Sequence, residues 1–220
     1  MRKRKLGRYV LGTACIVCAG IVIRIFAGEI AVVSSVSMEP TLHSGDRIWI
    51  DKLSYGASLP VRYSEIPIIN VFTWISRFRE RDMKNQWKYR RMRGFTMPRE
   101  GDVAVFHHPE NRATLLIKRI GRILHRGDSI VVTSGTWNDY AGILSCEKGE
   151  AARKNDSLLV AGGLNLSCRL TENYYFLLGD HDDNSWDSRH FGYLSEENLV
   201  GKAGLLLFSK KRKRMMQRIR

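Results

Sequence analysis

The sequence predicts a mainly β extracytoplasmic domain behind one N-terminal transmembrane helix. Three observations predict this fold class: an apolar stretch near the start, short β-branched runs separated by Gly-Asp pairs, and basic residues gathered in a few segments. With 220 residues, the chain can form one substantial domain with its own core plus an anchor. We expect a cytoplasmic basic N-terminus over 1–5, the anchor over 6–27, the domain over 28–209 and a basic C-terminal tail over 210–220.

The apolar stretch has the length of a membrane span. It reaches the roughly 20 residues that a bilayer demands, provided that Arg8 and Arg24 extend toward opposite interfaces. A cleavable secretory signal also has a basic start and an apolar middle, and Ala27 and Gly28 permit a cut, but the length favours a retained anchor. Five basic residues precede the span and one follows it. This asymmetry predicts a cytoplasmic N-terminus and a domain outside the membrane.

The net charge of +14 lies in three segments. Residues 1–8 and 210–220 hold twelve basic residues and no acidic one, and residues 77–93 hold eight basic and two acidic ones. The rest of the chain is mildly acidic, so a nucleic-acid groove across the fold is not supported. Basic flanks instead favour anionic lipid headgroups, near which each Lys or Arg gains about 1 kcal/mol.

Short runs rich in β-branched and aromatic residues predict the strands of the domain. Gly-Asp pairs that favour turns stand between many of them. The runs cover residues 31–33, 47–50, 103–106, 115–120, 129–133, 174–178 and 203–208.

Two segments do not follow the strand pattern. Segment 56–98 has an apolar part too short to span a bilayer. We expect either an interfacial helix or membrane-touching flap there, or a helix that covers one end of the β core. The basic tail is expected to be disordered or bound to a surface.

The four cysteines fall into two groups. Cys15 and Cys18 lie in the apolar stretch, where they are expected to be small packing residues without redox chemistry. Cys146 and Cys168 lie in the exported part, where an oxidising compartment permits a disulfide if their Cα atoms come close enough.

Ser37 is the candidate nucleophile and Lys118 its candidate base. A lone Ser-x-Ser-Met means little, because serines are common in turns. Ser37, however, follows the apolar stretch by about ten residues. Strand alternation places Lys118 on one face with Leu116 and Ile120, where loss of hydration lowers the lysine pKa from about 10.4. A lysine on an edge strand with its amine in solvent is the alternative.

A polar segment over residues 179–192 is the third candidate site element. Its Asp180, Asp182 and Asn184 have the alternate spacing of calcium ligands. The loop lacks a glycine at the sixth position and a glutamate at the twelfth. We therefore expect no metal and no cofactor here.

Taken together, these segments resemble the bacterial type I signal peptidases, the Ser/Lys proteases that release exported proteins from their leader peptides. The resemblance rests on residues 37–42, 101–106, Lys118-Arg119 and 179–192, in the family order. It implies a β-rich catalytic domain on the outer face of the bacterial cytoplasmic (inner) membrane, held by one span. The implied partners are signal peptides of exported precursors and anionic membrane lipids, with no nucleic acid.

The resemblance also implies a role for each site residue. Ser37 attacks the scissile carbonyl, Lys118 is the general base, and Ser185 holds the lysine amine. The Ser35 hydroxyl and the Ser37 backbone N–H form the oxyanion hole. Further residues are implied as a structural salt bridge, Asp187 and Arg189, and as a substrate pocket, Val33, Met38, Leu42 and Ile117. Cleavage is expected after small residues in an Ala-x-Ala-like context, at a rate that rises as Lys118 deprotonates.

The sequence departs from the family pattern in two places. His181 and Asp182 stand where Asn and Arg are usual, and the stretch after Arg119 lacks the usual proline. These changes leave the proposed catalytic groups in place and bear on substrate preference and on the region between Arg119 and Tyr174.

Other interpretations remain open. A histidine-based serine protease needs a histidine beside Ser37, for which His190 is the best placed. The self-cleaving repressors share Ser/Lys chemistry but normally carry a DNA-binding module where this chain has its apolar stretch. A membrane adaptor without enzymatic activity, and a Ser/Lys peptidase dedicated to one specialised export system, are further alternatives.

Overall fold

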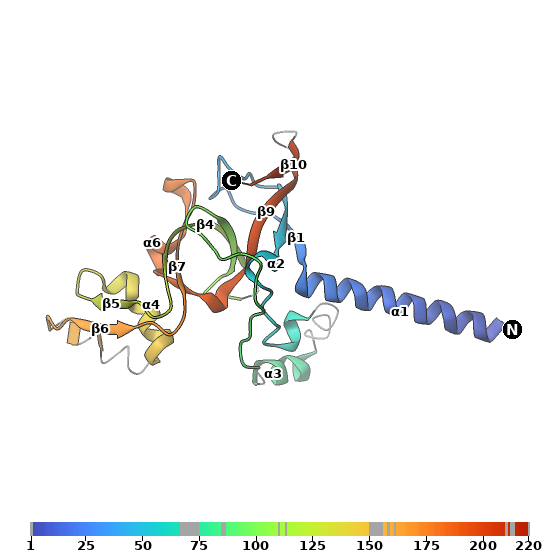
Figure 1. Cartoon of the computed structure of the whole chain (residues 1–220), viewed down its shortest axis with the longest axis horizontal. Helices are drawn as coiled ribbons and strands as arrows, with labels where there is room; N and C mark the ends of the chain where they lie inside the picture. Colours follow the sequence, from blue (N-terminus) through green and yellow to red (C-terminus); the bar gives the residue numbers. More distant parts are fainter. Residues whose placement is uncertain are drawn as a thin grey trace.

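A curled antiparallel sheet forms the body of the protein, and helix α1 extends away from it (Figure 1). The computed structural model describes residues 2–66, 75–84, 87–109, 111, 112, 114–149, 156, 157, 159, 160, 162–209, 211 and 214–219. The strand order is β1-β2-β9-β3-β4-β7-β8, and β10 also pairs with β9. The prediction of a mainly β fold is confirmed.

Each of the seven runs singled out in the sequence overlaps with a strand, although the bounds differ. The main sheet comprises β1 (Gly28–Val32), β2 (Arg47–Asp51), β3 (Val103–His107), β4 (Leu115–Leu124), β7 (Tyr174–Leu178), β8 (Leu194–Ser195), β9 (Leu199–Ser209) and β10 (Arg214–Arg218). A second sheet pairs β5 (Ser129–Val132) with β6 (Leu166–Arg169). The helices are α1 (Arg2–Phe26), α2 (Lys52–Tyr55), α3 (Ser76–Lys84), α4 (Trp137–Lys148) and α6 (Ser188–Phe191), with short 3-10 turns at Tyr63–Glu65, Asp182–Asn184 and Glu196–Asn198.

Strand β3 is buried on both faces of the sheet. Val105 packs in one cluster with Ile48, Ile50 and Leu206. Phe106 packs in a second cluster, with Ile120, Tyr175 and Leu177. This position between two clusters explains why the run from Val103 to Phe106 is continuously apolar. A third cluster joins β5 and β6 to α4.

Helix α1 occupies the residues predicted to be the anchor. Among the residues that the structure describes, no helix combines the length and the apolar composition needed to cross a membrane. Large apolar side chains such as Leu11 and Ile16 are exposed along α1. The end of α1 is tied to the sheet, because Arg24 pairs with Glu29 at 3.0 Å and Lys52 Nζ donates to the Arg24 carbonyl at 3.0 Å.

The two segments outside the strand pattern now have partial descriptions. Of segment 56–98, residues 67–74, 85 and 86 lie outside the described residues; the rest includes a 3-10 turn, α3 and an antiparallel bridge between Ser58 and Arg91. Residues 214–218 form β10, so the expected disordered or surface-bound tail was wrong there. The reason is that β3 pairs with β9 only over Leu199–Lys202, and β10 continues along the same strand over Leu205–Ser209.

The cysteine hypothesis is not supported by the structure. No disulfide joins Cys146 and Cys168; the first is exposed on α4 and the second is buried on β6. Cys15 and Cys18 are exposed on α1.

Candidate active site

Ser37 lies in the loop that connects β1 to β2. Its side chain is only 6% exposed, and its hydroxyl lies 3.0 Å from the hydroxyl of Ser35. The Ser37 carbonyl accepts a hydrogen bond from the backbone N–H of His181 at 3.1 Å. Met38 and Leu42, which follow Ser37, are buried in the core. The loop is therefore anchored through its apolar side chains and through the polar segment that begins at Gly179.

Lys118 lies in the middle of β4 and is 3% exposed. Its Nζ donates to Ser185 Oγ at 2.8 Å. Burial lowers the pKa of Lys118 below its ordinary value, although the charge of Asp187 acts in the opposite direction. The predicted burial of this lysine is confirmed, and the edge-strand alternative is excluded because β4 lies between β3 and β7. A buried amine with a lowered pKa is suited to accept a proton near neutral pH.

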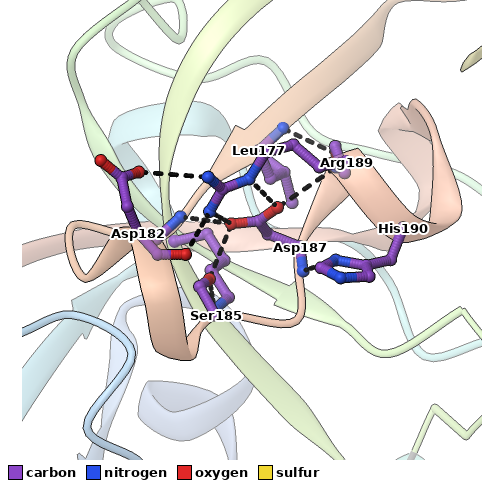
Figure 2. A network of polar contacts seen from close by, with 9 residues as sticks. Leu177, Asp182, Ser185, Asp187, Arg189 and His190 are labelled. Atoms are coloured by element: carbon purple, nitrogen blue, oxygen red, sulfur yellow. Dashed lines mark hydrogen bonds and ion pairs between the residues drawn. The ribbon is translucent and has the colours of Figure 1, made fainter.

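A hydrogen-bonded network around Asp187 holds Ser185, the partner of the lysine amine (Figure 2). Ser185 Oγ donates to Asp187 Oδ2 at 2.7 Å. The same carboxylate accepts from the Gly179 N–H at 2.9 Å and from Arg189 Nε and Nη2 at 3.0 and 2.8 Å. Because the Ser185 proton is directed to Asp187, a Ser185 lone pair is available to the lysine amine.

Asp187 organises this network and is fully buried. Burial alone would raise its pKa, but hydrogen bonds from Arg189, Ser185 and Gly179 outweigh burial and hold the pKa well below its ordinary value. Its side chain also caps α6 by accepting from the Arg189 backbone N–H, while the His190 ring accepts from the Asp187 N–H at 3.5 Å. His190, the histidine best placed for a histidine-based protease, thus takes part in the N-terminal cap of α6.

A second ion pair beside the site was missed at the sequence level. Arg119 Nε and Nη2 each donate at 2.7 Å to Asp180, and Thr41 Oγ1 also donates to this carboxylate. Asp182, which shares the alternate spacing of calcium ligands with Asp180, pairs with Arg189 at 3.1 Å. Arg119 and Asp180 lie 61 residues apart, so no local pattern indicates the pair.

Gly179 brings the loop of Ser37 and the polar segment into close contact. A Cβ at this position would lie 2.1 Å from Ser185 Oγ and 2.7 Å from the Ser37 carbonyl oxygen. Both distances are far below van der Waals contact, so only glycine fits here.

A cavity of about 560 Å³ brings the two candidate catalytic side chains together. Ser37 and Lys118 line it with Ser35 and with three of the four predicted pocket residues, Val33, Met38 and Ile117. Leu42 is not among its lining residues; it packs in the core with Ile48 and Ile50 and lines a separate cavity. Trp186, which the sequence did not single out, lines the cavity and stacks on His108 with ring centroids 4.6 Å apart.

Comparisons with known proteins agree with this geometry. Residues 6–208 match the family described as "Signal peptidase, peptidase S26". The Signal peptidase I of Aquifex aeolicus is 27% identical over 232 aligned residues, which cover 89% of this chain and 82% of the relative. The Signal peptidase I of Rickettsia typhi is 28% identical, with 89% and 78% covered, and that of Helicobacter pylori is 24% identical, with 90% and 80% covered. Since the family match spans most of the residues, this chain belongs to the signal peptidase family, peptidase S26.

Proposed function

We propose that this chain is a serine endopeptidase that removes N-terminal signal peptides from exported proteins. The observation that carries the proposal is the buried Lys118 amine, 2.8 Å from Ser185 Oγ, in the cavity that Ser37 also lines. A serine hydroxyl is a poor nucleophile until a nearby base takes its proton, and a neutral lysine can serve as that base.

In the proposed mechanism, Ser37 Oγ attacks the scissile carbonyl while its proton moves to Lys118 Nζ. The tetrahedral oxyanion accepts from the Ser37 N–H and the Ser35 hydroxyl, and each such donor typically lowers the barrier by about 3 kcal/mol. Lys118 then gives its proton to the leaving amine as the carbon–nitrogen bond breaks, which leaves an ester on Ser37. Neutral Lys118 next takes a proton from water as the water oxygen attacks the ester carbonyl, and it returns that proton to Ser37 Oγ when the ester C–O bond breaks and the new carboxyl end is released.

Val33, Met38 and Ile117 support a preference for small residues before the cleaved bond. These buried or half-buried apolar side chains line the same cavity as Ser37, so they present an apolar wall to the substrate side chains next to the cleaved bond. We propose cleavage in an Ala-x-Ala-like context, as in the signal sequences of exported precursors.

The proposed location is the bacterial cytoplasmic membrane, with the N-terminus inside and the domain outside. Helix α1 has 25 residues, which at 1.5 Å per residue give about 37 Å, compared with a hydrocarbon core of about 30 Å. The exposed Leu11 and Ile16 side chains on α1 and the basic residues before them favour insertion into a bilayer that contains anionic lipids.

The test uses the full chain in liposomes with an exported precursor that carries Ala or Phe before the cleaved bond. We expect the wild type to cut the Ala precursor at least tenfold faster than the Phe precursor, and Ser37→Ala to cut neither. Equal rates on both precursors would overturn the proposed specificity. Absence of cleavage by the wild type under every lipid condition would favour the adaptor.

A further inference from the structure

Strand β10 packs beside the loop that carries Ser37. The strand lies outside residues 6–208, the range that matches the family, and it pairs with β9 over Leu205–Ser209. A cavity of about 320 Å³ lies between the two segments, lined by Pro40, Thr41 and Leu42 from the loop and by Arg214, Gln217, Arg218 and Ile219 from the β10 side. Ile219 also packs against the core cluster that holds Met38 and Leu42.

Two basic side chains from this part of the chain contact the residues on either side of Pro40. Arg214 Nη2 donates to the Thr41 carbonyl at 3.3 Å, and Lys211 Nζ lies 3.2 Å from Glu39 Oε1. The Lys211 side chain is 63% exposed, so its ion pair contributes little. Arg214 is half-buried, and its contact is therefore the stronger restraint on the loop.

Thr41 connects Arg214 to the strand that bears the lysine. The Thr41 hydroxyl donates to Asp180, and Asp180 is held by both nitrogens of the Arg119 fork. Arg119 directly follows Lys118 on β4. Arg214 and Arg119 thus both hold Thr41: Arg214 donates to its carbonyl, and Arg119 binds Asp180 and also donates to the Thr41 hydroxyl at 3.4 Å.

We propose that Arg214 is a positioning residue, which holds the Ser37 loop in place relative to Lys118 without touching the reacting atoms. The inference rests on the proposed function, because it assigns the loop a catalytic role. Ser37 must approach Lys118 closely for proton transfer, and a misplacement of about 1 Å can cost about 100-fold in rate. The contact therefore acts on kcat more than on KM.

The experiment measures kcat and KM for precursor cleavage by full-length Arg214→Met, Arg214→Lys and Arg218→Met. Arg218 is the matched control, since it lies on the same strand and lines the same cavity but is exposed. We expect Arg214→Met to lower kcat at least tenfold with KM changed less than twofold, Arg214→Lys to recover part of the loss, and Arg218→Met to resemble the wild type. The pH at half-maximal rate should not move, because the surroundings of Lys118 stay the same.

Thermal unfolding and a Ser37→Ala variant distinguish a failure of the positioning role of Arg214 from a failure of the proposed function. Equal kcat values for Arg214→Met and Arg218→Met, or a loss in Arg214→Met that matches only its unfolded fraction, would overturn the positioning role. Cleavage by Ser37→Ala would instead overturn the proposed function itself. A loss in Arg214→Met that appears entirely in KM would also contradict the inference, because it would indicate a role in substrate binding.

Discussion

Replacement of Ser185 by alanine tests how the hydrogen-bonded network around Asp187 supports catalysis by Lys118. The Ser185 hydroxyl accepts from Lys118 Nζ at 2.8 Å and donates to Asp187 Oδ2 at 2.7 Å, and the residue is 7% exposed. A buried donor left without its acceptor costs about 1–3 kcal/mol. At about 1.4 kcal/mol for each factor of ten, kcat/KM should fall by about 5- to 150-fold.

The variant should also change the pH dependence of the reaction. A hydroxyl that accepts from the amine favours the protonated lysine, so its removal lowers the pKa of Lys118 further. The rise of kcat/KM with pH should therefore begin at a lower pH in Ser185→Ala than in the wild type. The assay is precursor cleavage across neutral and alkaline pH.

Ser188→Ala is the matched control for this measurement. Ser188 is also a buried serine, but its hydroxyl accepts from the Leu177 N–H and not from Lys118. We expect this control to lose stability while keeping the pH profile of the wild type. An unchanged kcat/KM and profile in Ser185→Ala, or equal effects in both variants, would refute the role of Ser185 as a support of the lysine.

Three further predictions concern stability and packing. Lys118→Met should raise Tm at pH 7, because the pKa of Lys118 is lower in the folded chain than in the unfolded chain, so that protonated Lys118 opposes folding. The gain in Tm should vanish above about pH 10.4, where the lysine of the unfolded chain is also neutral. A Tm difference between variant and wild type that stays the same from pH 7 to above about pH 10.4 would argue against this prediction. Gly179→Ala should abolish cleavage and lower Tm, since its Cβ would lie 2.1 Å from Ser185 Oγ; wild-type rates would contradict the packing. The lowered pKa of Asp187 contributes stability that is present above about pH 4 and is lost as the pH falls below it. Asp187→Asn should therefore lower Tm at pH 7 and reduce the fall of Tm with acidification. Plots of Tm against pH that run parallel for variant and wild type would refute this prediction.

The strands and the lysine could be predicted because their signals are local. The run from Val103 to Phe106 is apolar on both faces, and alternation in the run around Lys118 correctly predicted that its side chain is buried. The site residues Ser37 and Ser185 needed the resemblance to a family, because isolated serines carry little information.

The elements that escaped prediction depend on contacts distant in sequence. Strand β10 has the sequence Arg-Met-Met-Gln-Arg, which lacks the β-branched pattern of a strand. It pairs with the edge of β9 over Leu205–Ser209 that β3 leaves open, while β2 pairs with the opposite edge. Helix α4 contains Gly142, which weakens the helical signal, and it is held by Ile143 and Leu144 in the third core cluster. Leu42 shares a core cluster with Val33 and Met38 but does not line the cavity of Ser37, a distinction that depends on the path of the loop and not on a local sequence pattern.

The central claim is that Ser37 and Lys118 perform the cleavage together. The most direct measurement is precursor processing in membranes by the wild type, Ser37→Ala and Lys118→Met, with thermal unfolding to show that each variant is folded. We predict that both variants are folded and inactive, and that the wild-type rate rises with pH to a plateau as Lys118 deprotonates. Cleavage by folded Lys118→Met, or a wild-type rate that is flat across neutral and alkaline pH, would contradict the lysine base.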